Sequence, residues 1–488
     1  MKTMKYLIAV AGMAMALVGH LPDADAQTRL WGTYYGGTKG EQTNKVANDA
    51  FGNVYVVGNT MSATGIATAN SFDSVKLDAN TVSGFLAKFD TNGKRVWGTY
   101  YGDHIASAAD LVDVALDGGG NSIYVLGHVV CPSQGLATPG AYKSQCQGTR
   151  DMYLAKFDFM GKRVWGTYFG GPGNESATGL SVMPNGDVYI IGATGSSQGI
   201  ASAGSVDSTL GGSSDAVVAK FTGSGKLSWA RYFGGEGNDF GWDLVCKGLP
   251  RTSCFITGYT ESSNGIATPA AHDIELGSLG PTGDAFVARI SGLSGNTDWS
   301  TYYGGTGEDQ GMSIAADANL NVYVGGFTYS QQEIATPNGF DGKWNGDWDM
   351  FVAKFNGGGQ RIVGTYYGNS EQDYLLDLAT DVSGNVYMLG KVFDGFSNPD
   401  LATPNAYDTT INWEDAIVVK FNPNLGRIWA TYYGGNEGEM FDNGGLSVGS
   451  NNHVYVTGGT QSPDSMATPG SHKQALQIQD AFLVEFAQ

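Results

Sequence analysis

Acidic side chains recur at one place of an internal repeat, and they are the first residues that could support chemistry. A run of the form WxTYYGG occurs in seven copies, and in six of them a carboxylate follows four residues after the second position of the glycine pair. These acids are Glu41, Glu175, Asp239, Asp309, Asp373 and Glu439, whereas the second copy has Ser107 there. A ring of carboxylates would suit Ca²⁺ or a basic peptide, although no cofactor is required. Alternatively, each carboxylate accepts backbone N–H bonds and locks its own loop, which the regular recurrence favours.

A second acid recurs before a later strand of each repeat. Its members are Asp151, Asp215, Asp284, Asp349, Asp415 and Asp480, with Ser83 in the first repeat. We interpret it as a hydrogen-bonding residue at a turn or strand entry rather than as a metal ligand.

Four tryptophans depart from the repeat: Trp242 lies in a predicted strand, and the other three are candidates for ligand binding. Trp344, Trp348 and Trp413 lie in long connections, outside the WxTYYGG runs. Flat aromatic side chains on exposed loops suit sugar rings or the anchor residues of a protein partner. The alternative is that they pin long loops onto the body of the protein, and both interpretations remain open.

Catalytic motifs are nearly absent. GSSQG at Gly195 matches GxSxG, but it lacks the strand–turn–helix context that the motif needs. His104, His128 and His272 are the weak candidates for acid or base chemistry, with His104 and His128 in the same repeat. A histidine in a loop is usually only solvated, so we lean toward a protein without enzymatic activity.

Charge and an N-terminal signal restrict the class of protein. The formal net charge of −20 disfavours nucleic acid and favours cationic partners. Residues 1–26 have lysines, a short apolar run and Ala24-Asp25-Ala26, which together indicate a secretory signal peptide rather than a membrane anchor. We therefore expect an exported monomer, in the periplasm, at the cell surface or outside the cell, with no membrane insertion.

The four cysteines fall into two close pairs. Cys131 lies near Cys146, and Cys246 lies near Cys254. An exported chain permits disulfides, and an even number at short range predicts two local bridges. A zinc site is the alternative, but no CxxC motif or histidine ladder supports it.

The repeat specifies the elements that must position these side chains. Its copies begin near residues 31, 97, 165, 229, 299, 363 and 429. Each contains four short apolar or alternating runs bounded by Gly, Asn or Asp, which predict four strands. Repeated four-stranded units predict an all-β, seven-bladed β-propeller formed as one domain by residues 27–488.

The two ends of this domain predict how the ring closes. It begins with an outermost strand, Trp31–Gly37, and finishes with a third strand, Ala481–Phe486. The N-terminal strand would complete the last blade and hide two sheet edges. The recurrent acids would then surround the mouth of the central channel, on the face that carries the long loops.

The whole unit, IATPxAxD…DAFVAKFNxxGxRxWxTYYGGxGxDxxxxIAxDxxGNVYVxGxT, closely resembles the bacterial β-propeller repeat called SBBP. This resemblance implies a secreted bacterial seven-bladed propeller, and it implies no common enzymatic activity and no agreed ligand.

Our leading hypothesis is a secreted, non-catalytic binding or scaffold propeller that recognises a carbohydrate or a protein partner on its long-loop face. The alternatives are a polysaccharide-active, lyase-like enzyme with its site on the same face, and a structural component of the cell surface. The lyase would need His104, His128 or His272 to converge with Tyr or Arg in one pocket.

Overall fold

Short β-branched and aromatic runs form the strands, and glycine, asparagine and aspartate form the turns between them. The computed structural model describes residues 27–488 except for 77–79, 103–107, 278–281, 395–400 and 440–442. A typical hairpin turn joins the first two strands of a blade at Asp49–Asn53. There the Gly52 N–H donates to the Asp49 carbonyl (3.0 Å), and Gly52 has a φ of 81°, which a residue with a Cβ rarely adopts.

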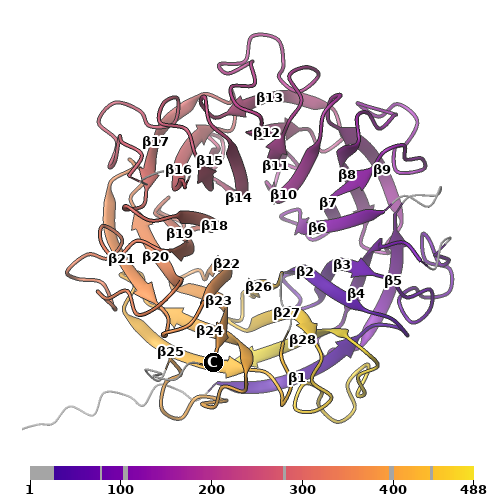
Figure 1. The fold of residues 1–488 in the computed structure, drawn as a ribbon. Coiled ribbons are helices and arrows are strands. Elements are labelled where there is room, and N and C mark those ends of the chain that lie inside the picture. Colours follow the sequence, from indigo (N-terminus) through magenta and orange to yellow (C-terminus); the bar gives the residue numbers. More distant parts are fainter. Residues whose placement is uncertain (1–26, 77–79, 103–107, 278–281, 395–400, 440–442) are drawn as a thin grey trace, which may run out of the picture.

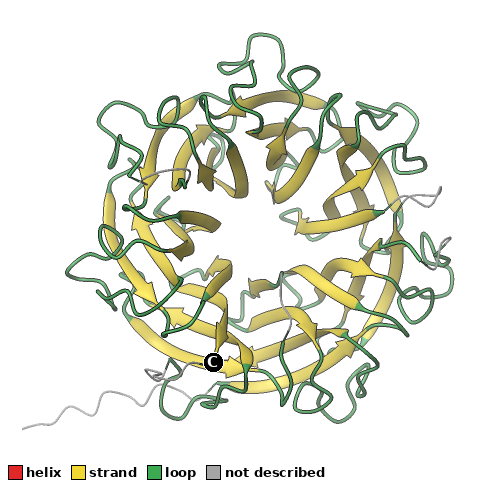
Figure 2. Ribbon diagram, in the orientation of Figure 1, coloured by secondary structure: helices red, strands yellow, loops and turns green. Residues whose placement is uncertain are grey.

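The described residues form 28 strands and no helix (Figure 2). Blades 1 and 2 contain β2 (Glu41–Asn48), β3 (Val54–Thr60), β4 (Ser83–Phe89), β5 (Arg95–Tyr101), β6 (Ala109–Leu116), β7 (Ser122–Val130), β8 (Arg150–Asp158) and β9 (Arg163–Phe169). Blades 3 and 4 contain β10 (Glu175–Val182), β11 (Val188–Thr194), β12 (Asp215–Phe221), β13 (Leu227–Phe233), β14 (Asp239–Lys247), β15 (Ser253–Thr260), β16 (Asp284–Ser291) and β17 (Thr297–Tyr303).

The remaining strands complete the other three blades. Blades 5 and 6 contain β18 (Asp309–Ala316), β19 (Val322–Thr328), β20 (Asp349–Phe355), β21 (Arg361–Tyr367), β22 (Tyr374–Thr380), β23 (Val386–Phe393), β24 (Glu414–Phe421) and β25 (Arg427–Tyr433). Blade 7 contains β26 (Gly445–Val448), β27 (Val454–Thr460), β28 (Asp480–Ala487) and β1 (Thr28–Tyr35).

Each blade is one antiparallel sheet, and in blades 1 to 6 the strands pair in chain order from the centre outward (Figure 1). The innermost strands, from β2 round to β26, surround a central channel, and the WxTYYGG runs form the outermost strands. The predicted all-β, seven-bladed propeller is thus confirmed. Among the described residues, no helix is long and apolar enough to cross a membrane.

The N-terminal strand closes the ring, as the sequence predicts. The sheet of blade 7 has the order β1-β28-β27-β26, so the first described strand pairs with the last. The antiparallel register joins Thr28 to Ala487 and Tyr35 to Ala481. This pairing removes the two open sheet edges that an unclosed ring would present.

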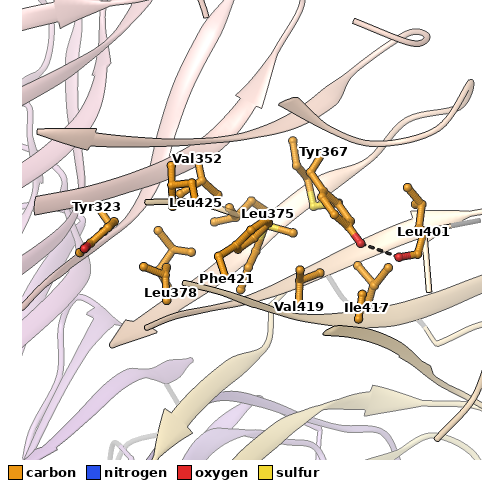
Figure 3. Close-up of a cluster of buried hydrophobic side chains, with 14 of the residues drawn as sticks. Tyr323, Val352, Tyr367, Leu375, Leu378, Leu401, Ile417, Val419, Phe421 and Leu425 are labelled. Carbon is orange, nitrogen blue, oxygen red and sulfur yellow. Dashed lines mark hydrogen bonds between the residues drawn. The ribbon is translucent and has the colours of Figure 1, made fainter. Parts of the chain in front are cut away.

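Neighbouring blades pack through the aromatic side chains of the WxTYYGG motif. The Trp31 indole donates to the Thr91 carbonyl of the next blade (3.1 Å), and the Tyr35 hydroxyl donates to the Ile66 carbonyl (2.8 Å). Figure 3 shows the equivalent bond of a later junction, from Tyr367 to the Leu401 carbonyl (2.6 Å), beside buried side chains of blades 5 and 6. The motif therefore provides inter-blade packing and hydrogen bonds.

Both predicted disulfides are present. Cys131–Cys146 brackets the long connection between the second and third strands of blade 2, and Cys246–Cys254 joins directly paired residues of β14 and β15. All four cysteines are paired. Two disulfides indicate that the protein folds in an oxidising environment of the kind that exported proteins meet.

Candidate functional site in the central channel

An irregularity in the innermost strands builds a cavity on the channel axis. In six of these strands, from β2 to β22, the pairing with the second strand skips one residue. The skipped residues are Asn44, Val112, Thr178, Trp242, Met312 and Leu376. All six, together with Gly444 before β26, line a cavity of about 260 Å³. A β-bulge re-aims a side chain, and here it makes each blade contribute one residue to the wall.

The cavity lies at the long-loop end of the channel. Its wall consists of residues near the beginnings of the innermost strands, together with His128 near the end of β7. His128 Nε2 lies 3.2 Å from Asp110 Oδ2, on the neighbouring strand β6. The half-buried Trp242 indole lies nearly parallel to the Phe240 ring, with the ring centroids 6.4 Å apart. The wall therefore combines apolar, aromatic and hydrogen-bonding groups, which is typical of a ligand pocket.

A layer of charged side chains forms the floor of this cavity. Lys45 Nζ lies 2.6 Å from Asp377 Oδ1, and Asp113 and Asp243 complete a group of three carboxylates around the single ammonium. Burial by itself would lower the pKa of Lys45, but the three carboxylates raise it above its ordinary value. Burial raises the pKa of Asp113 to about 7, and the pKa of Asp243 is also raised by burial.

The same layer also joins the blades to one another. Asp113 Oδ2 accepts a bond from the Leu180 N–H of the next blade (2.7 Å). Asp243 accepts from the Ile314 N–H (3.0 Å) and Asp377 from the Leu446 N–H (2.8 Å). A second cavity, of about 290 Å³, lies beyond the layer and is also lined by Lys45 and Asp243. The Lys–Asp layer thus divides the channel into two compartments.

The recurrent acids that the sequence singles out do not line either of these cavities. Glu41, Glu175, Asp239, Asp309, Asp373 and Glu439 are all buried. Glu41 shows the arrangement: Oε2 accepts from the Gly37 N–H (2.8 Å) and Oε1 accepts from the Thr60 hydroxyl (2.8 Å). Burial raises the pKa of Glu41, although these bonds oppose the shift. Each of the six carboxylates accepts a bond from the N–H at the second position of the glycine pair in its own crossover loop, which supports the interpretation that these acids lock their loops. A ring that binds a cation or a basic peptide at the channel mouth stays a prediction.

In the second repeat, the residue that takes the place of the recurrent acid is not Ser107, which counting along the sequence predicts. Ser107 lies outside the described residues. The first paired residue of β6, which corresponds to the acids of the other blades, is Ala109. Counting residues from the glycine misplaces this position because the crossover of blade 2 is two residues longer.

The three candidate tryptophans have different surroundings. Trp348 stacks on Phe327, with centroids 4.5 Å apart and planes 6° from parallel, and it also contacts Tyr329 and Tyr374. Trp344 packs against a buried cluster formed by blades 4 and 5. Trp413, in contrast, is 76% exposed on a residue with a φ of 63°. Of the three, Trp413 presents a mostly exposed ring, and its ligand-binding role remains a prediction.

The two candidate histidines that the structure describes, His128 and His272, belong to different blades and do not form a shared site. His104 lies outside the described residues. His272 does lie near Tyr303 and Arg361, and burial followed by that guanidinium lowers its pKa. However, the Tyr303 hydroxyl already donates to the Ile334 carbonyl (2.8 Å).

The surroundings of His272 recur elsewhere in the ring. His472 contacts Tyr35 and Phe89 in the same way, and at another junction Phe72 takes the histidine position beside Tyr101 and Phe157. Because phenylalanine can replace the histidine, the convergence around His272 is part of the inter-blade packing.

The sequence alone does not single out the charged residues of the Lys–Asp layer, which are Lys45, Asp113, Asp243 and Asp377. Their signal is that a charged side chain directly follows the skipped residue in four of the innermost strands. The residue type at that place changes from blade to blade, so a search for recurring residues passes over it.

The fold, the bulged innermost strands and the closed ring define the class of this protein as a seven-bladed β-propeller. The profile of the SBBP family, described as a beta-propeller repeat, matches residues 298–331. The resemblance to this repeat that the sequence suggests is confirmed.

One curated relative is the regulatory protein FlaEY of Caulobacter vibrioides. It is 24% identical over 416 residues, which cover 81% of this chain and 40% of that protein. The chain thus spans less than half the length of this relative.

Solved structures also resemble the fold at low identity. Polysaccharide lyase Uly1 is 10% identical, with 94% of this chain and 98% of that chain covered and a TM-score of 0.44. Quinohemoprotein alcohol dehydrogenase from Comamonas testosteroni is 11% identical, with 94% and 76% covered and a TM-score of 0.39. These similarities assign no function to this chain.

Proposed function

We propose that this protein is a secreted, non-catalytic binding propeller that takes a neutral carbohydrate into the cavity at the long-loop end of its channel. The observation that supports the proposal is the wall of that cavity. It contains the Trp242 indole, the His128 imidazole, the Asn44 amide and the apolar Met312 side chain around a volume of about 260 Å³, and His128 is itself paired with Asp110. Sugars combine apolar ring faces with hydroxyl groups, so an aromatic surface beside hydrogen-bonding groups suits them.

The charge of the protein supports a neutral rather than an anionic sugar. The formal net charge is −20, and the floor of the cavity holds three carboxylates for one ammonium. A uronate or sulfate group would be repelled by both the overall and the local charge. A lyase acting on uronates is correspondingly disfavoured. A site made by His272, Tyr303 and Arg361 is disfavoured for a second reason, because the Tyr303 hydroxyl already donates to a backbone carbonyl.

A glycan array that includes neutral oligosaccharides, uronate-containing polymers and sulfated polymers tests the proposal. We expect the purified protein to bind neutral glycans, and we expect Trp242→Ala to weaken that binding at least tenfold. Trp413→Ala is the matched control, because it removes an exposed indole of the same face outside the cavity. Unchanged binding by Trp242→Ala, or binding that depends on Trp413 alone, would place the site on the loops instead. A protein partner captured through the cavity with no glycan bound would contradict the carbohydrate assignment.

A further inference from the structure

Each recurrent crossover acid meets a second buried acid that belongs to the preceding blade. Both side chains lie against the first glycine of the crossover, where a Cβ would collide with them. The six pairs are Asp480 with Glu41, Asp151 with Glu175, Asp215 with Asp239, Asp284 with Asp309, Asp349 with Asp373, and Asp415 with Glu439. At the remaining junction both acids are replaced together, because Ser83 faces Ala109 across Gly102. Two buried carboxyl groups this close need a compensating cation or a proton.

At the blade 7–1 junction a lysine supplies the compensating charge. Lys473 Nζ lies 2.7 Å from Asp480 Oδ1 and 3.2 Å from the carbonyl oxygen of Gly36. Asp480 forms its pair with Glu41, and neither acid has a buried oxygen without a hydrogen-bond partner. This junction therefore does not need a shared proton.

The blade 6–7 junction has the two acids but no such lysine. Asp415, near the start of β24, and Glu439 are both fully buried, and both lie against Gly434. The loop position that corresponds to Lys473 is taken by Asp408. In the part of the chain that the structure describes, no lysine, arginine or histidine forms an ion pair with any of these three acids.

The two acids of this junction are hydrogen-bonded to each other. Asp415 Oδ2 accepts from the Asn412 N–H (2.9 Å), and Glu439 Oε1 accepts from the Gly435 N–H (3.2 Å). The other two oxygens, Asp415 Oδ1 and Glu439 Oε2, are buried beside Gly434 and have no donor from elsewhere in the described chain. An ionised carboxylate can only accept, so a hydrogen bond between two carboxyl groups requires a proton on one of them.

The other groups that face this pair add negative charge or remain neutral. Asp408, on the long connection of blade 6, raises the negative potential at Asp415. On blade 7, the Thr460 hydroxyl donates to Glu439 Oε1 (3.2 Å). From β1, the Tyr34 hydroxyl donates to the Ser462 carbonyl (2.7 Å), and burial raises the pKa of Tyr34 to about 12, so it stays neutral.

The nearby charged groups outside the pair are engaged elsewhere. Lys391 of β23 is paired with Glu414 (3.3 Å). The Arg29 guanidinium of β1 lies over the Tyr407 ring, with its central carbon 5.3 Å from the ring centroid. Asp464 accepts from the exposed Asn436 of the crossover.

We propose that Asp415 and Glu439 share one proton, and that loss of this proton to solvent at alkaline pH opens the crossover between blades 6 and 7. Release of the proton changes the charge of the pair from −1 to −2, and two carboxylates without a cation repel each other in a buried site. The same crossover contains Gly438, which lies beside the exposed Trp413. The proton therefore controls part of the long-loop face.

The electrostatics of the pair agree with this assignment. Burial, followed by the hydrogen bond with Glu439, raises the pKa of Asp415 to about 9. Burial also raises the pKa of Glu439, but the hydrogen bond with Asp415 opposes that rise, so the proton resides on Asp415 and Glu439 accepts it. An aspartate in water has a pKa of about 3.9. Between these values the closed junction holds a proton that the open one releases, so the closed form loses its advantage as the pH rises.

Hydrogen–deuterium exchange of the full-length protein between pH 6 and pH 9 tests this proposal. We expect the protection factor of residues 434–439 to fall by up to about tenfold for each pH unit, because each opening releases one proton. Residues 36–41 form the equivalent crossover beside Lys473 and are the control within the same molecule. Their protection factor should stay constant over this range.

Two variants separate the shared proton from other effects of pH. Glu439→Gln carries an N–H group that donates to Asp415 without titrating, so residues 434–439 should lose their dependence on pH. Glu41→Gln makes the same change at the junction that contains Lys473, and it should leave the pH dependence of residues 434–439 unchanged. Lys473→Met removes the ammonium and should transfer the pH dependence to residues 36–41.

Three outcomes would each overturn the proposal. The first is an equal response of residues 434–439 and 36–41 to pH in the wild-type protein, and the second is an unchanged pH dependence in Glu439→Gln. The third is a folded Lys473→Met variant in which residues 36–41 stay insensitive to pH. If Lys473→Met does not fold, the first two comparisons still decide the question.

Discussion

Lys45 and Asp377 meet at 2.6 Å on the axis of the propeller, although 332 residues separate them in the sequence. Lys45 belongs to the innermost strand of blade 1, and Asp377 belongs to that of blade 6. The contact therefore spans the central channel and depends on the whole ring being assembled. It makes the Lys–Asp layer both the floor of the candidate pocket and a reporter of ring integrity.

Removing this ammonium should destabilise the fold. Lys45→Met leaves Asp113, Asp243 and Asp377 without their shared cation, and removing one partner of a buried pair costs about 3 kcal/mol. Urea unfolding would measure the loss, with the exposed Lys226→Met as the control. The double variant Lys45→Met/Asp377→Asn should recover part of the stability. Equal stability of Lys45→Met and the wild-type protein would show that the layer contributes no net electrostatic stabilisation.

Stability should fall as the pH rises from about 4 to about 7. Burial raises the pKa of Asp113 from 3.8 to about 7, so in this window the folded state retains a proton that the unfolded state has lost. Stability decreases with pH wherever the folded state binds more protons. The decline in melting temperature, measured in the presence of EDTA, should be smaller in Asp113→Asn than in the wild-type protein. The exposed Glu236→Gln should keep the wild-type slope, and an identical slope in Asp113→Asn would contradict the assignment.

Deletion of residues 27–35 should lower the stability of the ring and promote association, although the deleted segment is short. Without β1, the edge of β28 is exposed, and open edges pair with other chains. We expect size-exclusion chromatography to show association and thermal unfolding to become less cooperative. A synthetic peptide of residues 27–35, added in excess, should restore the monomer by pairing with β28. A monomeric deletion variant with a single wild-type transition would argue against the closure.

The two disulfides should differ in their accessibility to a reductant. Cys131 and Cys146 are half-buried, whereas Cys246 and Cys254 are buried between paired strands. Under native conditions, alkylation and mass spectrometry should detect the reduced Cys131–Cys146 pair first. Replacing both of these cysteines by serine should cost about 3 kcal/mol, the value expected for a loop of about 15 residues. Simultaneous alkylation of all four cysteines would show that reduction requires global unfolding.

The fold follows from the sequence because every blade repeats the same local signals. The WxTYYGG run, the Asp49–Asn53 type of turn and the position of the first outermost strand are each visible in one chain. Together they predict the number of blades, the order of strands and the closure. None of these features depends on which side chains meet across the ring.

The candidate sites could be predicted only in part. Both families of acids are visible in the sequence, but Asp415 and Glu439 come from different strands of neighbouring blades, and only the packed junction brings them together. The cavity wall was missed for another reason. Trp242 points to the axis because its strand skips it in the ladder, and a bulge leaves no composition signal in a single repeat.

The closure of blade 7 also determines how the ring responds to force. The register places Thr28, at the start of β1, opposite Ala487, at the end of β28. Tension applied between the two chain ends would therefore break the hydrogen bonds between β1 and β28 one after another, beginning at the Thr28–Ala487 end. The bonds would not all be loaded in shear at the same time. The propeller should resist heat as one cooperative body and yet open at low pulling force along a single, defined seam.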